Sequence, residues 1–343
     1  MTAKAQIYTK HQKALHFAII PLIIIIIQLY GCGHNSPIQK SGFYFDTIIS
    51  VTLYDSSKTE ELEHCFELAD TYEKYFSTKI EDSDISKINR AGTKPVHVHD
   101  ETKELLEKGL SYSKLSQGKF DITIGKLTEL WDFHSETPSL PNAKKIAKAV
   151  SNVDYHNVKI NGNEVSLSNP DAAIDLGGIA KGYIADKIKE YLLSCGITSG
   201  IINLGGNVLT IGEKTDGSAY TIGIQRPFDE TGAAIATLKL KGQTVVTSGT
   251  YERYFQKDDV LYHHILDTST GYPYDNGLCS VSIICSQSVD GDGLSTTCFA
   301  LGLEKGMELI ESLDDTEAIF ITSDQVLHCT SGIGTKIPFE ELK

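Results

Sequence analysis

Apolar and polar residues follow two different rhythms along this 343-residue chain. Apolar residues at helical spacing predict helices over 59–76, from Asp100 to near Gly118, over 142–150 and over 179–195. Alternating or β-branched runs predict strands over 44–54, 172–176, 200–204, 220–225, 237–240, 244–247, 262–266 and 280–284, and a hairpin over 158–167. The later strands follow one another through short turns, which favours an antiparallel sheet, so the pattern predicts an α+β fold.

The first 31 residues have the pattern of an export signal. Three lysines precede an apolar stretch from Leu15 to Leu29, and Tyr30-Gly31-Cys32 follows. A basic start, an apolar segment of this length and small residues at its end describe a secretory signal. The ending resembles a bacterial lipobox, in which the cysteine is lipidated, and an uncleaved membrane anchor is the alternative. We expect a signal peptide over 1–31, a linker over 32–42 after a lipidated Cys32, and one catalytic domain over 43–343, exported and tethered to the outer face of the cytoplasmic membrane.

Charge and cysteine usage narrow the function classes. The chain carries a formal charge of −14, and because residues 1–31 hold three lysines and no acid, their removal would leave −17. So acidic a protein disfavours nonspecific binding of nucleic acid. Six cysteines follow Cys32, none in a C-x-x-C pair, so we expect mostly buried thiols and no zinc site; disulfides are permitted in an exported protein but are not indicated by the spacing.

A glycine turn between a predicted strand and a predicted helix is the first candidate site. Asp175-Leu176-Gly177-Gly178 ends the strand, and the helix that follows presents backbone amides where an anion such as a diphosphate can bind. Lys181 precedes Gly182, unlike the order of a P-loop, and the dinucleotide fingerprint is absent. A turn that only lets strand and helix pack is an equal alternative. A second glycine turn, Gly205-Gly206, ends the next strand, and the two strands with their helix could form one βαβ unit.

Two polar constellations stand in the second half of the chain. Adjacent His263 and His264 point to opposite faces of a strand, so at most one serves a site. Asp267 begins a turn that could orient the imidazole, and a histidine that is merely hydrogen-bonded is the alternative. Asp292 and Thr296 lie one helical turn apart, and their oxygens are the hard ligands that Mg²⁺ prefers, with helix capping as the alternative.

Together these motifs resemble those of the ApbE family, the FAD:protein FMN transferases. The resemblance covers nearly all of residues 43–335. It rests on segments 83–89, 119–121 with 130–131, 175–186, 203–207, 247–253, 263–271 and 292–296. It implies an ApbE-like, T-fold-related architecture in two halves, with largely antiparallel sheets flanked by helices and the flavin nucleotide in the cleft between them.

The resemblance also implies a Mg²⁺-dependent reaction and its residues. FAD is the substrate, a Thr or Ser hydroxyl of an acceptor protein attacks the FMN phosphorus, and AMP leaves. The implied acceptor is a flavin-carrying subunit of a membrane electron-transport complex. The implied metal ligands are the Gly178 carbonyl, Asp292 and Thr296, and the implied base is His264, oriented by Asp267. The implied contacts to FAD are Phe45, Lys79, Lys119, Phe120, Asp121, Asp175, Lys181 and Leu266.

The chain departs from the family pattern at three places. Phe45-Asp46-Thr47 stands where Met-Gly-Thr is common, Lys79 stands where many relatives have an aromatic residue, and Thr268 replaces the usual proline. Two other functions share the same residues: an FAD pyrophosphatase, in which water replaces the acceptor, and a flavin-binding lipoprotein without chemistry. A mere binder needs no base beside its metal, which argues against the last. A Rossmann-type dehydrogenase is disfavoured by the missing fingerprint.

Overall fold

An eight-stranded sheet runs through the part of the chain described by the computed structural model, which comprises residues 36–133, 137–230 and 232–342. Its order is β1-β2-β6-β7-β10-β13-β14-β15, and every neighbouring pair is antiparallel. The strands are β1 (Ile38–Tyr44), β2 (Thr47–Leu53), β6 (Ser199–Leu204), β7 (Asn207–Gly212), β10 (Thr244–Gly249), β13 (Leu278–Cys285), β14 (Glu317–Thr322) and β15 (Leu327–Cys329).

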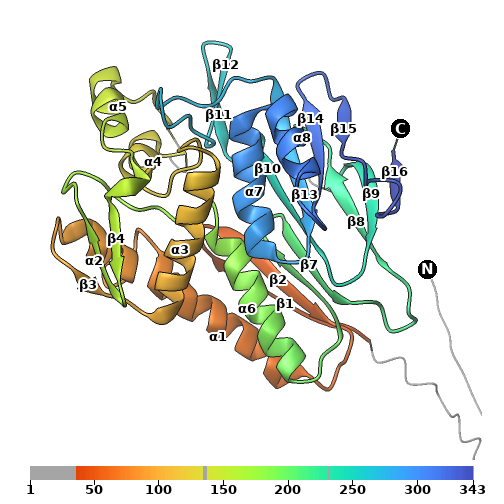
Figure 1. Cartoon of the computed structure of the whole chain (residues 1–343). Coiled ribbons are helices and arrows are strands. Elements are labelled where there is room, and N and C mark those ends of the chain that lie inside the picture. The colour runs from red at the N-terminus through yellow and green to blue at the C-terminus, as the bar shows by residue number, and fades with distance from the viewer. Residues whose placement is uncertain (1–35, 134–136, 231, 343) are drawn as a thin grey trace, which may run out of the picture. The chain divides into compact units, whose positions relative to one another are not determined.

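Helices cover one face of this sheet and a small sheet covers part of the other (Figure 1). The helices are α1 (Thr59–Phe76), α3 (Asp100–Leu115), α6 (Ala180–Ser194), α7 (Ser288–Leu301) and α8 (Leu303–Glu311). The small sheet consists of β8 (Tyr220–Gln225), β9 (Ala234–Leu240) and β16 (Phe339–Glu341). Because β13 lies between both layers, all eight of its residues are buried. The predicted α+β class with largely antiparallel sheets is confirmed.

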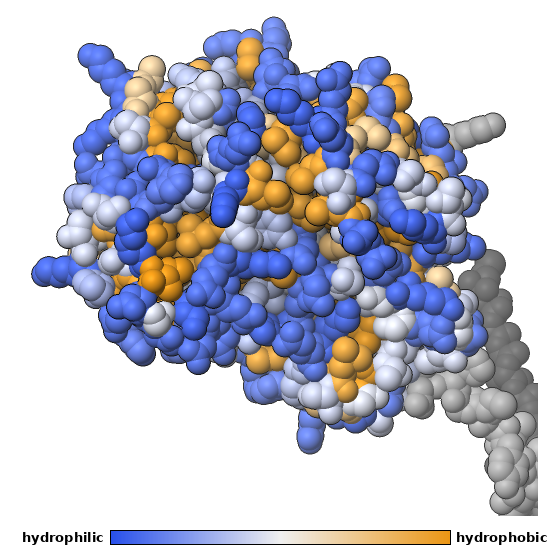
Figure 2. Space-filling model, in the orientation of Figure 1, coloured by the Kyte–Doolittle hydropathy of each residue, from blue (hydrophilic) through white to orange (hydrophobic). Residues whose placement is uncertain are grey.

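Smaller elements surround these layers. They are α2 (Asp84–Arg90), α4 (Gly125–Trp131), α5 (Ala143–Val150), a 3-10 turn (Tyr155–Asn157), β3 (Val96–His97), β4 (Val158–Asn161), β5 (Glu164–Leu167), β11 (Tyr254–Lys257) and β12 (Val260–His263). The β11–β12 hairpin packs on α4 and α5 in a separate apolar cluster around Trp131. In Figure 2, apolar residues show mainly in the upper part of the view, and the lower part is largely hydrophilic.

Four expectations about elements need correction. Residues 38–42, predicted as linker, form most of β1. Their more and less exposed side chains alternate along the strand, and they pair with β2. Residues 172–176 are extended but make only an isolated bridge between Ala173 and Ile124, so they are not a strand of a sheet. No βαβ unit forms there, because β6 pairs antiparallel with β2 and β7. The predicted strand 262–266 ends earlier, at His263. The strand predicted over 44–54 begins only at Thr47, because a turn at Phe45 and Asp46 separates β2 from β1.

The hairpin over 158–167 forms as β4 and β5 around Gly162, whose φ is +59°. The six cysteines of the described region are free thiols, four of them buried. Within that region no helix combines the length and apolar character that crossing a bilayer requires.

Candidate functional site

The glycine turn before α6 packs against Phe120 and α7. A Cβ on Gly178 would lie 3.1 Å from the Phe120 ring and 3.9 Å from Thr296 Oγ1, so only glycine lets the backbone come this close. The Asp175 carboxylate fixes the turn, since it accepts the Gly177 N–H at 2.8 Å and the Thr128 hydroxyl at 2.7 Å. The turn therefore packs tightly against α7, and the Asp175 carboxylate already accepts hydrogen bonds from within the protein.

The Gly178 carbonyl is left without a donor by the way α6 begins. In a regular helix the N–H of Gly182 would bond to this carbonyl, four residues earlier. Here Gly182 N–H instead donates to Asp292 Oδ2 of α7 at 2.9 Å. Among the described residues no hydrogen bond reaches the Gly178 oxygen.

Asp292 and Thr296 complete a set of three oxygen groups with Gly178. The Asp292 side chain is 5% exposed, and its Oδ1 lies 3.8 Å from Lys181 Nζ, beyond hydrogen-bond distance. Thr296 is the only residue from 291 to 300 that is not fully buried, and its Oγ1 lies 3.1 Å from Ser248 Oγ at the end of β10. The structure thus brings together all three residues predicted to hold a metal.

The donor chemistry of this set fits Mg²⁺. It offers one carboxylate, one hydroxyl and one free carbonyl, all hard oxygens, and leaves positions for substrate oxygens and water. Nowhere in the described ranges do three or more His, Cys, Asp or Glu side chains gather as a metal cluster. The set contains no His or Cys ligand of the kind that zinc prefers, and its three hard oxygens suit an ion such as Mg²⁺.

Charged residues surround the metal set. Lys181 Nζ donates to the Gly177 carbonyl at 3.3 Å. Desolvation raises the pKa of the Glu252 carboxyl, and the positive charges of Lys181 and Arg253 oppose this rise. A Cβ on Gly206 would lie 3.9 Å from Glu252 Oε1, which places the second glycine turn at the same site. The positive charges of Lys181 and Arg253 near this turn suit an anionic ligand.

The two histidines have different roles. His263 is buried, and both its ring nitrogens are satisfied: Nε2 donates to the Tyr274 carbonyl at 2.9 Å and Nδ1 accepts the Ile265 N–H at 3.3 Å. His264 Nδ1 lies 3.3 Å from the Arg253 carbonyl, which can only accept, so this nitrogen carries the proton and Nε2 keeps its lone pair. Of the two histidines, His264 is the one with a ring nitrogen available to accept a proton.

Burial keeps His264 neutral. It is the main cause that lowers the pKa of this imidazole to about 3, and the charges of Arg253 and His263 act in the same direction.

The predicted role of Asp267 needs correction. Asp267 Oδ1 accepts hydrogen bonds from the N–H and the hydroxyl of Ser269 in its own turn, at 2.8 and 2.7 Å. The His264 Nδ1–H donates to the Arg253 carbonyl and not to Asp267.

The β1–β2 turn reaches the site through Arg253. One guanidinium nitrogen of Arg253 lies 3.5 Å from the carbonyls of both Phe45 and Asp46. These two residues have φ of +52° and +57°, a conformation rare outside glycine that often marks functional turns. The Phe45 N–H donates to Glu73, and Lys79 pairs with Asp46 at 2.6 Å. Phe45 and Lys79 are thus linked to Arg253 through the β1–β2 turn, and their contact with a ligand stays a prediction.

The other predicted contacts divide between the site and its support. The Phe120 ring faces Gly178, whereas both Asp121 oxygens are occupied by Thr123 and the Tyr155 N–H, and burial raises the pKa of this carboxyl. The Asp121 side chain therefore supports a loop. Lys119 and Leu266 offer backbone groups next to Tyr274, whose hydroxyl donates to the Lys119 carbonyl at 3.2 Å.

Four residues of the site were not among the sequence candidates: Ser248, Glu252, Arg253 and Tyr274. Three of them lie in or beside the segment 247–253 that carried the family resemblance, and that segment was the available signal. Nothing in the local sequence indicated that Arg253 would supply a carbonyl to His264, because this contact depends on the β11–β12 hairpin between them.

Comparisons with known proteins give consistent matches over most of the chain. The model of the ApbE family matches residues 45–320. An FAD:protein FMN transferase of Klebsiella pneumoniae is 39% identical over 263 residues, 76% of this chain and 81% of the relative. One of Treponema pallidum is 30% identical over 339 residues, 92% of this chain and 94% of the relative. The crystal structure of the ApbE protein from Thermotoga maritima superposes with a TM-score of 0.79 at 31% identity, covering 86% of this chain and 97% of that one.

Proposed function

The chain belongs to the ApbE family and is an FAD:protein FMN transferase, and from this premise we propose that Gly178, Asp292 and Thr296 hold a Mg²⁺ ion on the FAD diphosphate while His264 accepts the acceptor's proton. The observation that carries the proposal is the Gly178 turn packed beside Thr296, with no hydrogen bond to its carbonyl among the described residues and with Asp292 held at the same helix start by the Gly182 N–H. When bound there, the ion neutralises the diphosphate and fixes it for in-line displacement.

The protein residues then have separate tasks in the transfer. Lys181 and Arg253 supply positive charge beside the diphosphate. His264 Nε2 takes the proton from the acceptor hydroxyl as its oxygen attacks the FMN phosphorus. The bond from that phosphorus to the bridging oxygen breaks, AMP leaves with this oxygen, and FMN remains as a phosphoester. The Arg253 carbonyl keeps the imidazole in the tautomer that this step needs.

The test combines protein, FAD, Mg²⁺ and a threonine-containing acceptor protein, with mass spectrometry for the covalent FMN adduct and chromatography for AMP. Asp292→Ala and Thr296→Ala should each lose the Mg²⁺-dependent transfer by about 100-fold or more. His264→Ala should still bind FAD but transfer about 100-fold more slowly. The matched control is His156→Ala, since His156 is exposed, pairs with Asp154 and stacks on Tyr155. Wild-type turnover in Asp292→Ala or Thr296→Ala contradicts the metal assignment, and free FMN without an adduct indicates a hydrolase.

We also propose that the chain is an exported lipoprotein whose acceptor is a flavin-carrying subunit of a membrane electron-transport complex. Cys32 and the predicted signal lie outside the described residues, so this proposal rests on their sequence pattern and on the resemblance. Cys32→Ala should accumulate as an unlipidated precursor of higher polypeptide mass, with Cys65→Ala, a buried thiol, as the control. A Cys32→Ala protein of unchanged mass and membrane fractionation would contradict the anchor.

A further inference from the structure

Helices α6 and α7 cap each other through two carboxylates. Asp292 of α7 accepts the Gly182 N–H in the first turn of α6 at 2.9 Å. In return, Asp186 of α6 accepts the N–H groups of Ser288 and Val289 at the start of α7, each at 2.8 Å. The helices cross so closely that a Cβ on Gly182 would lie 2.3 Å from the Ser288 carbonyl oxygen. The position of one helix start therefore depends on a side chain of the other.

Asp292 and Asp186 differ in whether a carboxylate oxygen is left to bind a ligand. Asp292 uses one oxygen for Gly182, and its second oxygen has no hydrogen bond among the described residues. Asp186 is 6% exposed and uses both oxygens for the first two residues of α7. It has no free oxygen for a metal, so its effect on the site passes through the placement of α7.

The sequence of α7 makes this placement necessary. Gly291 and Gly293 stand in its first two turns, and each glycine weakens a helix by about 1 kcal/mol relative to alanine. They are required because a Cβ at either position would lie 2.7 Å from Val246 or 2.4 Å from Tyr112. A helix start with two glycines does not hold its own geometry well, and external contacts must fix it.

A buried polar network adds to the anchor of Asp186. The Ser288 hydroxyl donates to Asn207 Oδ1 at 2.5 Å and lies 3.1 Å from the Thr244 hydroxyl. All three residues are buried. Asp292 and Thr296 follow Ser288 by four and eight residues, one and about two helical turns. A shift of the anchored start would therefore move both oxygens relative to the Gly178 turn.

We propose that Asp186 is a positioning residue of the metal site, which sets Asp292 and Thr296 against Gly178 by fixing the start of α7. The inference rests on the proposed function, because it presupposes a metal at these three residues. It assigns to Asp186 no contact with metal or substrate. It predicts that the metal requirement of the enzyme depends on this carboxylate even though the metal does not touch it.

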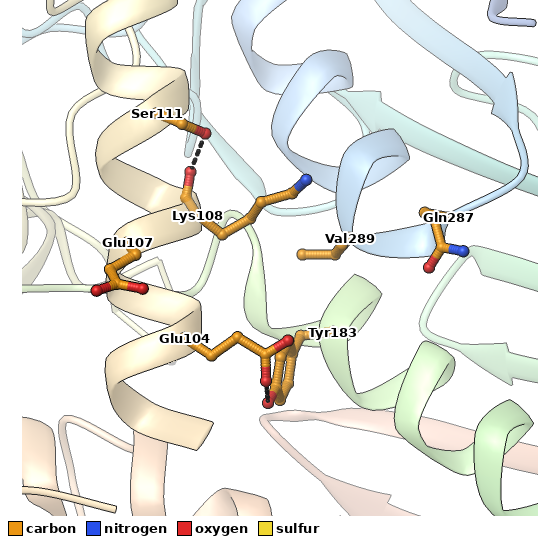
Figure 3. A pocket seen from close by; sticks show the side chains of 7 residues that line it. All are labelled: Glu104, Glu107, Lys108, Ser111, Tyr183, Gln287 and Val289. Atoms are coloured by element: carbon orange, nitrogen blue, oxygen red, sulfur yellow. Dashed lines mark hydrogen bonds between the residues drawn. The ribbon is translucent and has the colours of Figure 1, made fainter. Parts of the chain in front are cut away.

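Asp290 provides a matched control in the same helical turn. Its carboxylate also stands near the positive end of α7, but it points to α3, where it contacts the Tyr112 hydroxyl and pairs with Lys108 at 2.5 Å. Lys108, Tyr183 and Val289 line a cavity of about 510 Å³ between α3 and the starts of α6 and α7 (Figure 3). Asp290→Asn therefore removes a charge from the same helix end without touching the contacts between α6 and α7.

Asp186→Asn is expected to fold. Burial is the main cause that raises the pKa of this carboxyl to about 6, so the fold does not favour its charge. Asparagine has the same shape and keeps one acceptor oxygen, and only one of the two N–H bonds is lost. Asp186→Glu keeps the charge but adds a methylene to a packed crossing, and must displace α7. The two variants separate a role of charge from a role of position.

The test measures FAD binding by quenching of flavin fluorescence at increasing Mg²⁺, together with the Mg²⁺ concentration for half-maximal FMN transfer. Both Asp186→Asn and Asp186→Glu should raise the half-saturating Mg²⁺ at least tenfold, with the fold retained and FAD affinity at saturating Mg²⁺ close to wild type, while Asp186→Glu should also lose some thermal stability to the added methylene. Asp290→Asn should stay within twofold of wild type. If Asp186→Asn and Asp186→Glu respond to Mg²⁺ like wild type, or if Asp290→Asn shifts as much, the inference is wrong.

A reference variant separates this failure from failure of the proposed function. Asp292→Ala should abolish the Mg²⁺ dependence of FAD binding. If wild type itself shows no such dependence, or if Asp292→Ala matches wild type, the metal site is wrong and the role of Asp186 falls with it. If Asp292→Ala loses the dependence and Asp186→Asn keeps it, only the role of Asp186 is refuted.

Discussion

The closest contact between α6 and α7 predicts a measurable effect of one methyl group at Gly182. In Gly182→Ala the new Cβ would lie 2.3 Å from the Ser288 carbonyl oxygen, 2.6 Å from its carbon and 2.7 Å from Val289 Cα. Nonbonded carbon atoms prefer about 3.5–4.0 Å. All three neighbours are backbone atoms that no rotamer change can move, so the helices must separate by roughly 1 Å at this point.

The magnitude follows from two opposing effects. Overpacking of this kind costs about 3 kcal/mol, near the upper end of its usual range. Alanine in place of glycine within a helix returns about 1 kcal/mol. The net loss is about 2 kcal/mol, and with an unfolding entropy of about 2.1 cal/mol/K per residue over roughly 300 residues, Tm should fall by about 3 °C. A displacement of about 1 Å at a catalytic group can reduce the rate about 100-fold, so activity should fall far more than stability.

The assay pairs scanning calorimetry with the FMN-transfer rate at saturating Mg²⁺. The matched control is Gly223→Ala on β8, whose Cβ would meet only the Ala234 side chain at 3.3 Å, in the sheet on the opposite face. It should change Tm by about 1 °C or less and leave the transfer rate unchanged. A Gly182→Ala protein with wild-type Tm and wild-type transfer would refute the argument that the crossing positions the site.

Three further predictions concern protonation and the turn at the site. Because the pKa of His264 is lowered to about 3, its imidazole should remain neutral from pH 8 to about pH 4 by NMR, and kcat/KM for FAD should show no loss centred near pH 6.5; a titration at that pH would contradict the environment described. Arg253→Lys should raise KM for FAD several-fold, about 1 kcal/mol, because an ammonium cannot bridge the Phe45 and Asp46 carbonyls as the planar guanidinium does; an unchanged KM contradicts this. Burial raises the pKa of the Glu317 carboxyl, but hydrogen bonds from Thr330, Lys336 and the Gly332 N–H outweigh burial and hold this pKa below 4.5. The wild-type protein should therefore lose stability as pH falls below that value, whereas Glu317→Gln should be less stable at pH 7 and lose less stability on acidification. Parallel stability curves for the two proteins would be evidence against this prediction.

The sequence predicted the site best where local spacing determines geometry. Asp292 and Thr296 stand one turn apart on a helix wherever that helix lies, and the glycines at 177 and 178 required a tight turn. That the Gly177–Gly178 turn lies beside Asp292 and Thr296 could be expected only from the family resemblance, since no local rule places α7 at the start of α6. The free carbonyl of Gly178 was likewise beyond prediction, because it results from the capture of the Gly182 N–H by a residue 110 positions later.

Prediction failed where a polar residue had a nearer partner than expected. Asp267 stands three residues after His264, which suggested a pair, but a carboxylate two residues before a serine closes its own turn more readily than it reaches back along a strand. Residues 172–176 have strand-like composition, yet β6 has both its edges paired with β2 and β7, and no edge remains for them. In both cases the local sequence pattern permitted the predicted contact, but it did not indicate the other contact that forms in the structure.

The chemistry of the proposed metal ligands predicts that the site depends strongly on helix packing. A cluster of several acidic side chains could adjust its rotamers to a metal, but the described ranges hold no such cluster. One buried carboxylate, one hydroxyl fixed beside Ser248 and one backbone carbonyl have little freedom to adapt. Mg²⁺ demands near-octahedral geometry at about 2.1 Å, so the required precision must come from the relative placement of the Gly178 turn and α7. The close crossing at Gly182 and the capping by Asp186 are the contacts able to supply it, which is why substitutions that leave every ligand in place should still impair the enzyme.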